Sequence, residues 1–185
     1  MQNLKLLKKE LVKKGVAFEK GLSNQEIIEI EKIYNITFPI EYIEFLKIGL
    51  PVSKGFYNWR DLTPENINRI KEKMNIPFID IINYCDEIDY WPKGWGIRPE
   101  TDQELKKKIE LLLKEAPKLI PVYIHRYIPV TNGTPPIFSI MGLDIIYYGK
   151  NLFQYLEIEF GIKEYNGIKF EKIEHIKFWS DTINW

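Results

Sequence analysis

The chain has 185 residues, 45% of them hydrophobic and 28% charged, and its 26 basic and 26 acidic side chains give a formal net charge of zero. This length fits one domain over residues 1–185, which would bury roughly 70% of the surface that its unfolded chain exposes. A neutral chain is not typical of a nucleic-acid-binding protein, which usually has a strong positive excess. Cys85 is the only cysteine, so we expect no intramolecular disulfide and no cysteine-based zinc site, as suits a cytoplasmic protein.

Residues 1–20 contain six lysines and two glutamates and predict a short amphipathic helix. Leu4, Leu7 and Leu11 share one face at helical spacing and are expected to pack inward. Lysines interrupt every apolar run, and none approaches the ~20 residues that a membrane span needs. A basic amphipathic helix can also lie on a membrane surface. Packing is the favoured interpretation, and no membrane partner is expected.

Residues 22–51 predict two short helices joined at a Phe-Pro pair. Ser23 and Glu26 form a capping box, and Leu22 with Ile27 forms a hydrophobic staple. Pro39 is expected to open the second helix, where its missing N–H costs nothing. The buried stripes of the two helices are predicted to hold Ile27, Ile30, Ile33 or Tyr34, Tyr42, Phe45 and Leu46.

The middle of the chain contains segments with helical, extended and loop patterns. An extended segment with Phe56, Tyr57 and Trp59 should precede a helix that starts at Thr63, and residues 79–84 predict a buried strand. A loop rich in Trp, Gly and Pro follows. Thr101 and Glu104 then predict a second capping box, on a helix that ends at Pro117.

The remaining core is predicted to be a sheet. Residues 119–129, 137–141 and 143–148 should be strands, with a turn at Asn132-Gly133 between the first two. Asn151 can cap a helix that reaches Phe160, and residues 165–179 should add one or two more strands. Strands gathered after helices favour an α+β fold with a central sheet, antiparallel or mixed, packed against several helices.

Five pieces in fixed order carry a resemblance: FPIEYIEFLKIGLP, WPKGWGIRP, PVYIHRYIP, PIFSI and LDIIYYGKNLFQYLEIEF. Together they resemble the SUKH superfamily, in a bacterial branch related to fungal cell-wall assembly regulators. The resemblance covers residues 22–160, with KFWSDTI near the end. Residues 1–20 would then be an N-terminal helix, and residues 161–185 an extension of the sheet.

The resemblance implies an immunity protein that binds and neutralises the toxic domain, often a nuclease, of a cognate polymorphic toxin in the producing cell. It implies no catalytic residues, and the toxin-contacting residues of the family vary between members. The alternative is a non-enzymatic interaction, scaffold or regulatory protein similar to cell-wall assembly regulators. The sequence leaves the oligomeric state open, a homodimer included.

The residues themselves offer little catalytic chemistry. His125 and His175 lack the spacing of a metal site, and His125 is expected to be a hydrogen-bonded residue within a strand. Ser139 lacks the glycine-framed elbow of a hydrolase nucleophile. Cys85 lies beside acidic residues, which oppose formation of a thiolate. No enzyme activity, cofactor or bound metal is expected.

One segment could bear on a partner, because residues 80–104 hold seven acids against Lys93 and Arg98. These acids either serve a helix N-terminus or form a patch that selects a basic protein partner. Trp91 and Trp95 either plug the sheet or act as aromatic anchors within a polar rim. The candidate surface, which would cover a basic nuclease domain, comprises Tyr57, Trp59, Asp86, Glu87, Asp89, Trp91, Trp95, Asp102 and Glu104.

Overall fold

A computed structural model describes residues 2–165 and 173–184, and it confirms the α+β class. The described residues form a four-stranded antiparallel sheet in the order β3-β4-β5-β6. Its strands are β3 (Leu119–Tyr123), β4 (Arg126–Pro129), β5 (Ile137–Met141) and β6 (Asp144–Gly149). Within these residues no helix has both the length and the apolar character to cross a bilayer.

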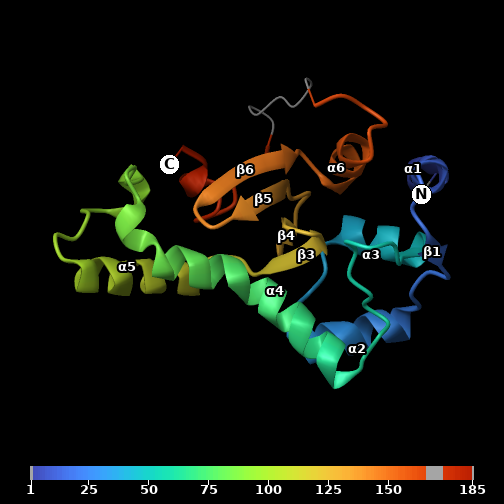
Figure 1. Cartoon of the computed structure of the whole chain (residues 1–185), viewed down its shortest axis with the longest axis horizontal. Helices are drawn as coiled ribbons and strands as arrows, with labels where there is room; N and C mark the ends of the chain where they lie inside the picture. The colour runs from blue at the N-terminus through green and yellow to red at the C-terminus, as the bar shows by residue number, and fades with distance from the viewer. Residues whose placement is uncertain (1, 166–172, 185) are drawn as a thin grey trace.

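The N-terminal region forms one end of the molecule (Figure 1), with α1 (Gln2–Lys13), α2 (Asn24–Tyr34) and α3 (Ile40–Ile48). The predicted capping box is present: the Ser23 hydroxyl accepts from the Glu26 amide, and the Glu26 carboxylate accepts from the Ser23 amide. Pro39 is the N-cap of α3 and not its first helical residue. The sequence did not predict a small sheet of β1 (Phe18–Glu19) and β2 (Leu50–Pro51).

The helix α4 (Pro64–Asn83) replaces the predicted strand at 79–84, so that prediction was wrong. A short apolar run cannot by itself distinguish a buried strand from a buried helix segment. Pro77 lies inside α4 and cannot donate to the carbonyl of Lys73, four residues earlier. The hydroxyl of Tyr127 donates to that carbonyl instead, at 3.2 Å. This bond compensates for the missing amide and lets the helix continue.

Strands β3 and β4 and most of β5 are buried on both faces, which explains why they read as continuous apolar runs, whereas β6 at the edge is partly exposed. Ile120, Ile128 and Ile137 face one core, which also contains Leu7, Leu11 and the apolar stripes of α2 and α3. Their neighbours in sequence face a second core. That second core contains Leu119, Tyr127, Phe138, Ile140, Ile145, Ile81, Cys85, Trp95, Leu105, Ile109, Phe178 and Trp179.

One strand prediction was wrong in detail, and another can be compared with the structure only in part. Residues 119–129 are two strands with a tight turn at Ile124 and His125, so His125 lies in a turn and not within a strand. Among residues 165 and 173–179 no strand is present, and residues 166–172 lie outside the described residues. The segment 173–179 instead turns over the second core, where the Trp179 indole donates to the Pro117 carbonyl at 2.8 Å.

The last two helices are α5 (Asp102–Lys114) and α6 (Leu152–Glu159). Asn151 caps α6 as predicted, because its side chain accepts from the Gln154 amide. The predicted box at α5 is half formed: the Thr101 hydroxyl accepts from the Glu104 amide and donates to the Glu104 carboxylate. The carboxylate is therefore bonded to the hydroxyl and not to the Thr101 amide.

Candidate functional site

The chain between α4 and α5 forms a projecting segment at one end of the long axis (Figure 1). We call residues 84–104 the acidic lobe; they include the short 3-10 helices η1 (Cys85–Glu87) and η2 (Lys93–Trp95) and the first turn of α5. The lobe lies opposite the end that carries α1, α2 and α3. It holds seven of the nine candidate surface residues.

Trp95 anchors the lobe to the second core and is only 3% exposed. Its ring stacks on Phe178, with centroids 4.8 Å apart and planes 11° apart. Its indole N–H donates to the Asp181 carboxylate at 3.2 Å, and that carboxylate also accepts from the Phe178 amide. Of the two alternatives for Trp95, the plug is therefore correct, and Trp95 is not available to a partner.

Trp91 joins parts of the lobe to each other through a hydrogen bond and a ring contact. Its indole N–H donates to the Gly96 carbonyl at 2.8 Å, and its ring meets Trp95 edge to face with centroids 5.2 Å apart. The Arg98 guanidinium lies 6.0 Å from the centre of the Trp91 ring. Trp91 is half-buried. These contacts give a Gly- and Pro-rich loop a defined shape without regular structure.

The lobe carries both exposed acids and exposed apolar groups. Asp86, Glu87 and Asp89 are all exposed. Ile97 is 94% exposed, and the rings of Tyr84 and Tyr90 are close to half exposed. Exposed apolar groups within a polar rim are characteristic of protein interaction sites. The sequence pattern did not predict the exposure of Ile97, Tyr84 and Tyr90, because it does not show which way the loop turns.

Two candidate residues lie elsewhere, and the structure contradicts their placement on a surface. Trp59 is fully buried, and its indole N–H donates to the Tyr42 hydroxyl at 2.9 Å. Tyr57 is 4% exposed and its hydroxyl donates to the Ile124 carbonyl at 2.6 Å. Burial raises the pKa of Tyr57 to about 12. Both rings belong to the first core, because the segment that carries them folds back under α4.

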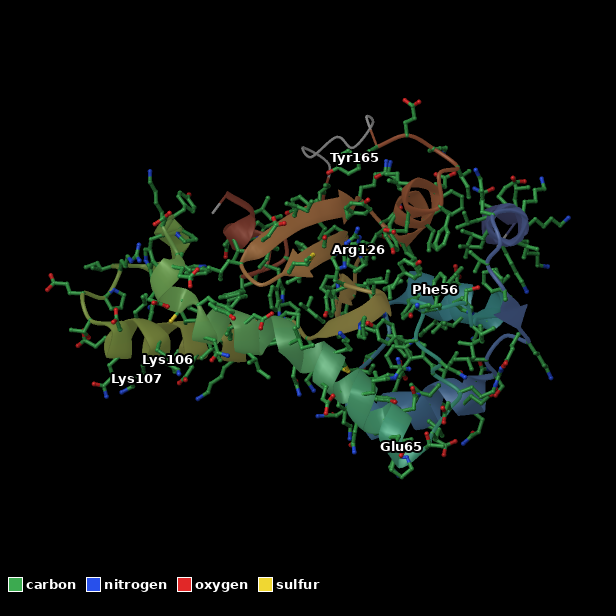
Figure 2. All side chains as sticks on the ribbon, viewed as in Figure 1. Phe56, Glu65, Lys106, Lys107, Arg126 and Tyr165 are labelled. Carbon is green, nitrogen blue, oxygen red and sulfur yellow. The ribbon has the colours of Figure 1, made fainter. Side chains whose placement is uncertain are left out.

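Asp102 and Glu104 lie in the first turn of α5, where acids oppose the positive end of the helix dipole. The two acids therefore lie at a helix N-terminus, as the first of the two interpretations requires, and both are also exposed. Exposed lysines follow on the same helix, and Figure 2 shows Lys106 and Lys107 at this end of the molecule. They reduce the negative charge on one side of the lobe.

The nucleophile and metal candidates are not brought together. Burial, and then the charge of Asp86, raise the pKa of the Cys85 thiol, the direction that opposes formation of a thiolate. Burial, and then the charge of Arg126, lower the pKa of His125. Over residues 2–165 and 173–184, no group of three or more His, Cys, Asp and Glu side chains could hold a metal ion.

The fold and site together define an α+β protein with a four-stranded antiparallel meander and a projecting acidic, aromatic lobe. Comparisons with models of protein families, with curated proteins and with solved structures found no match.

Proposed function

We propose that the protein is a SUKH-like immunity protein that binds the toxic domain of a cognate toxin, a nuclease in our proposal, in the cytoplasm of the producing cell. The resemblance in sequence order motivates this class, and the acidic lobe supplies a surface suited to the task. One observation supports the placement above all. Residues 84–97 carry an isoleucine that is 94% exposed, two half-exposed tyrosines and three exposed acids, and Trp95 anchors this segment to the second core.

The lobe is suited to tight binding because its shape is set before a partner arrives. Trp95 is fixed by Phe178 and Asp181, so little loop entropy remains to be lost on association. Exposed Tyr and Ile groups can fill pockets of a partner and slow dissociation. The acids act at longer range, because complementary charge mainly raises the association rate and selects the partner.

The charge distribution favours a basic partner. Residues 80–104 hold seven acids and two bases, whereas residues 1–20 hold two acids and six lysines, so these two segments differ in sign. A nuclease domain usually presents a positive groove to the phosphate backbone. A lobe that enters such a groove excludes the substrate without any chemistry. The mechanism is therefore occlusion by binding.

Rescue of growth tests the proposal. The candidate toxin domain, encoded beside the gene, is expressed with the wild-type protein or with Asp86→Lys/Asp89→Lys or Ile97→Asp. We expect the wild type to restore growth and both variants to lose protection, with the complex weakened by at least about tenfold. Tm and circular dichroism of the free variants should match the wild type, since all three positions are exposed.

The matched controls lie at the opposite end of the molecule. Ile28→Asp changes an isoleucine of α2 that is 59% exposed, and Glu29→Lys/Glu44→Lys reverses two exposed acids. We expect both controls to protect like the wild type. Full protection by Asp86→Lys/Asp89→Lys and by Ile97→Asp would refute the placement on the acidic lobe. Failure of the wild type to protect against, or bind, the toxin domain would refute the immunity function itself.

A further inference from the structure

A second concave site lies away from the acidic lobe, between α4, the segment around Gly55 and the turn that joins β3 to β4. The cavity has a volume of about 440 Å³. This size is within the ~300–1,000 Å³ of ordinary ligand pockets. Its lining residues are Lys54, Gly55, Phe56, Tyr57, Arg69, Lys73, Tyr123 and Ile124.

Three cations from two separate elements line this cavity, and no acid does. Arg69 and Lys73 share one face of α4 at a spacing of four residues, and Lys54 comes from the facing loop. Within the part of the chain that the structure describes, none of the three forms an ion pair with a carboxylate at 4.0 Å or less. Arg69 donates to the side-chain carbonyl of Asn66 at 2.6 Å, which holds the guanidinium in place.

Asp61, an acid near Arg69, does not form an ion pair with it. The pKa of Asp61 is lowered chiefly by hydrogen bonds from the Thr63 backbone and side chain, and Arg69 makes only a smaller contribution. Asp61 therefore faces Arg69 at longer range while it is bonded elsewhere. The pocket is a concentrated positive site in a protein whose formal net charge is zero.

The walls of the pocket are fixed by contacts between its two loop segments. The Ile124 amide donates to the Gly55 carbonyl at 2.9 Å, and the Tyr57 hydroxyl donates to the Ile124 carbonyl at 2.6 Å. Gly55 has φ of +103°, and a Cβ there would overlap the Tyr123 ring. Glycine is thus required for this close approach. A ligand would meet a cavity that is already formed.

Ile124 stores backbone strain at the rim. Its φ is +48°, a left-handed conformation that is a genuine outlier for a β-branched residue. Its side chain is 50% exposed, so the strain places an apolar group beside the cavity and not in the core. Strain of this kind costs about 1–3 kcal/mol and concentrates at ligand sites.

We propose that this cavity binds a small molecule that carries a phosphate monoester on an apolar or aromatic body. Three cationic residues that line one cavity suit a dianion, and the Arg69 guanidinium can donate two parallel hydrogen bonds to its oxygens. Tyr123 and Ile124 supply apolar wall for the organic part. The site goes beyond the toxin-binding function and is physically separate from it. Residue 69 and residue 83, the last of α4, are about 21 Å apart along the helix axis, and Figure 2 places Phe56 in the half of the molecule that carries α2 and α3.

Titration of the whole chain with phenyl phosphate, inorganic phosphate, benzoate and phenol tests this inference, with calorimetry or amide chemical shifts as the readout. We expect phenyl phosphate to bind most tightly, inorganic phosphate and benzoate to bind more weakly, and phenol not to bind. Lys54→Glu and Lys73→Gln should each weaken phenyl phosphate by about tenfold, the value of one charged hydrogen bond. Binding should also weaken with added salt.

The control is Lys71→Gln, an exposed lysine of α4 that does not line the cavity. It should bind phenyl phosphate like the wild type, and Tm should be unchanged in all three variants. No binding of phenyl phosphate at ~10 mM, about the weakest affinity that such contacts would give, would overturn the proposal. Equal binding by Lys54→Glu, Lys73→Gln and Lys71→Gln would overturn it as well. The titrations do not involve the toxin, so a failure to bind phenyl phosphate would leave the proposal for the acidic lobe unchanged.

Discussion

Truncation of Trp95 to alanine should destabilise the fold severely, although the residue belongs to an irregular loop. Trp95 is 3% exposed, stacks on Phe178 and donates to Asp181. Removal of a buried tryptophan side chain typically costs about 3–5 kcal/mol. In a chain of this length each kcal/mol lowers Tm by about 2–4 °C, so we expect a loss of about 6–20 °C.

Thermal and urea unfolding of two further variants separates the contribution of the Trp95 ring from that of its hydrogen bond to Asp181. Trp95→Phe keeps an aromatic ring for Phe178 but removes the donor to Asp181, so its Tm should fall between those of the wild type and Trp95→Ala. Ile97→Ala, two residues away and 94% exposed, should change stability by less than about 0.5 kcal/mol. A wild-type Tm for Trp95→Ala, or a large loss for Ile97→Ala, would refute the packing described for the lobe.

Three further changes test other parts of the fold. Tyr127→Phe leaves the carbonyl of Lys73 without its donor and should cost about 1–3 kcal/mol in urea unfolding; an unchanged midpoint would contradict the role given to this bond. Gly55→Ala forces a left-handed alanine against an aromatic ring and should lower Tm, so an equal or higher Tm would count against the geometry. Hydrogen bonds from Arg60 and then Ser23 lower the pKa of Glu26 from 4.5 to about 2. The stability from this carboxylate is present above pH 4.5 and is lost as the pH falls toward 2, and Glu26→Gln should flatten that part of the pH–stability curve.

The sequence predicted the features that depend on contacts between residues close together in the chain. The Ser23 and Glu26 cap, the Asn151 cap and the buried stripe of α3 depend on residues a few positions apart. The α+β class followed in the same way, from helices that precede a run of apolar strands. The strand predicted at 79–84 was wrong because a short apolar run does not distinguish a strand from a helix, and the hydroxyl that bonds the Lys73 carbonyl before Pro77 comes from Tyr127, fifty residues after Pro77.

The candidate site could likewise be predicted only where it depends on local sequence. Acidic residues of the lobe were predicted from composition, and their exposure agrees with that prediction. The burial of Trp95 could not be predicted from local patterns, because its partners Phe178 and Asp181 are more than eighty residues away in the sequence. The turn at Ile124 has no glycine or asparagine to mark it, so two strands read as one.

Hydrogen exchange of the protein with and without its toxin domain tests the central proposal most directly. We expect amides of residues 84–104 to exchange more slowly in the complex, while those of α2 (Asn24–Tyr34) at the opposite end stay unchanged. Protection confined to α2 or to the edge strand β6 (Asp144–Gly149), with the acidic lobe unaltered, would contradict the proposal that the lobe binds the toxin.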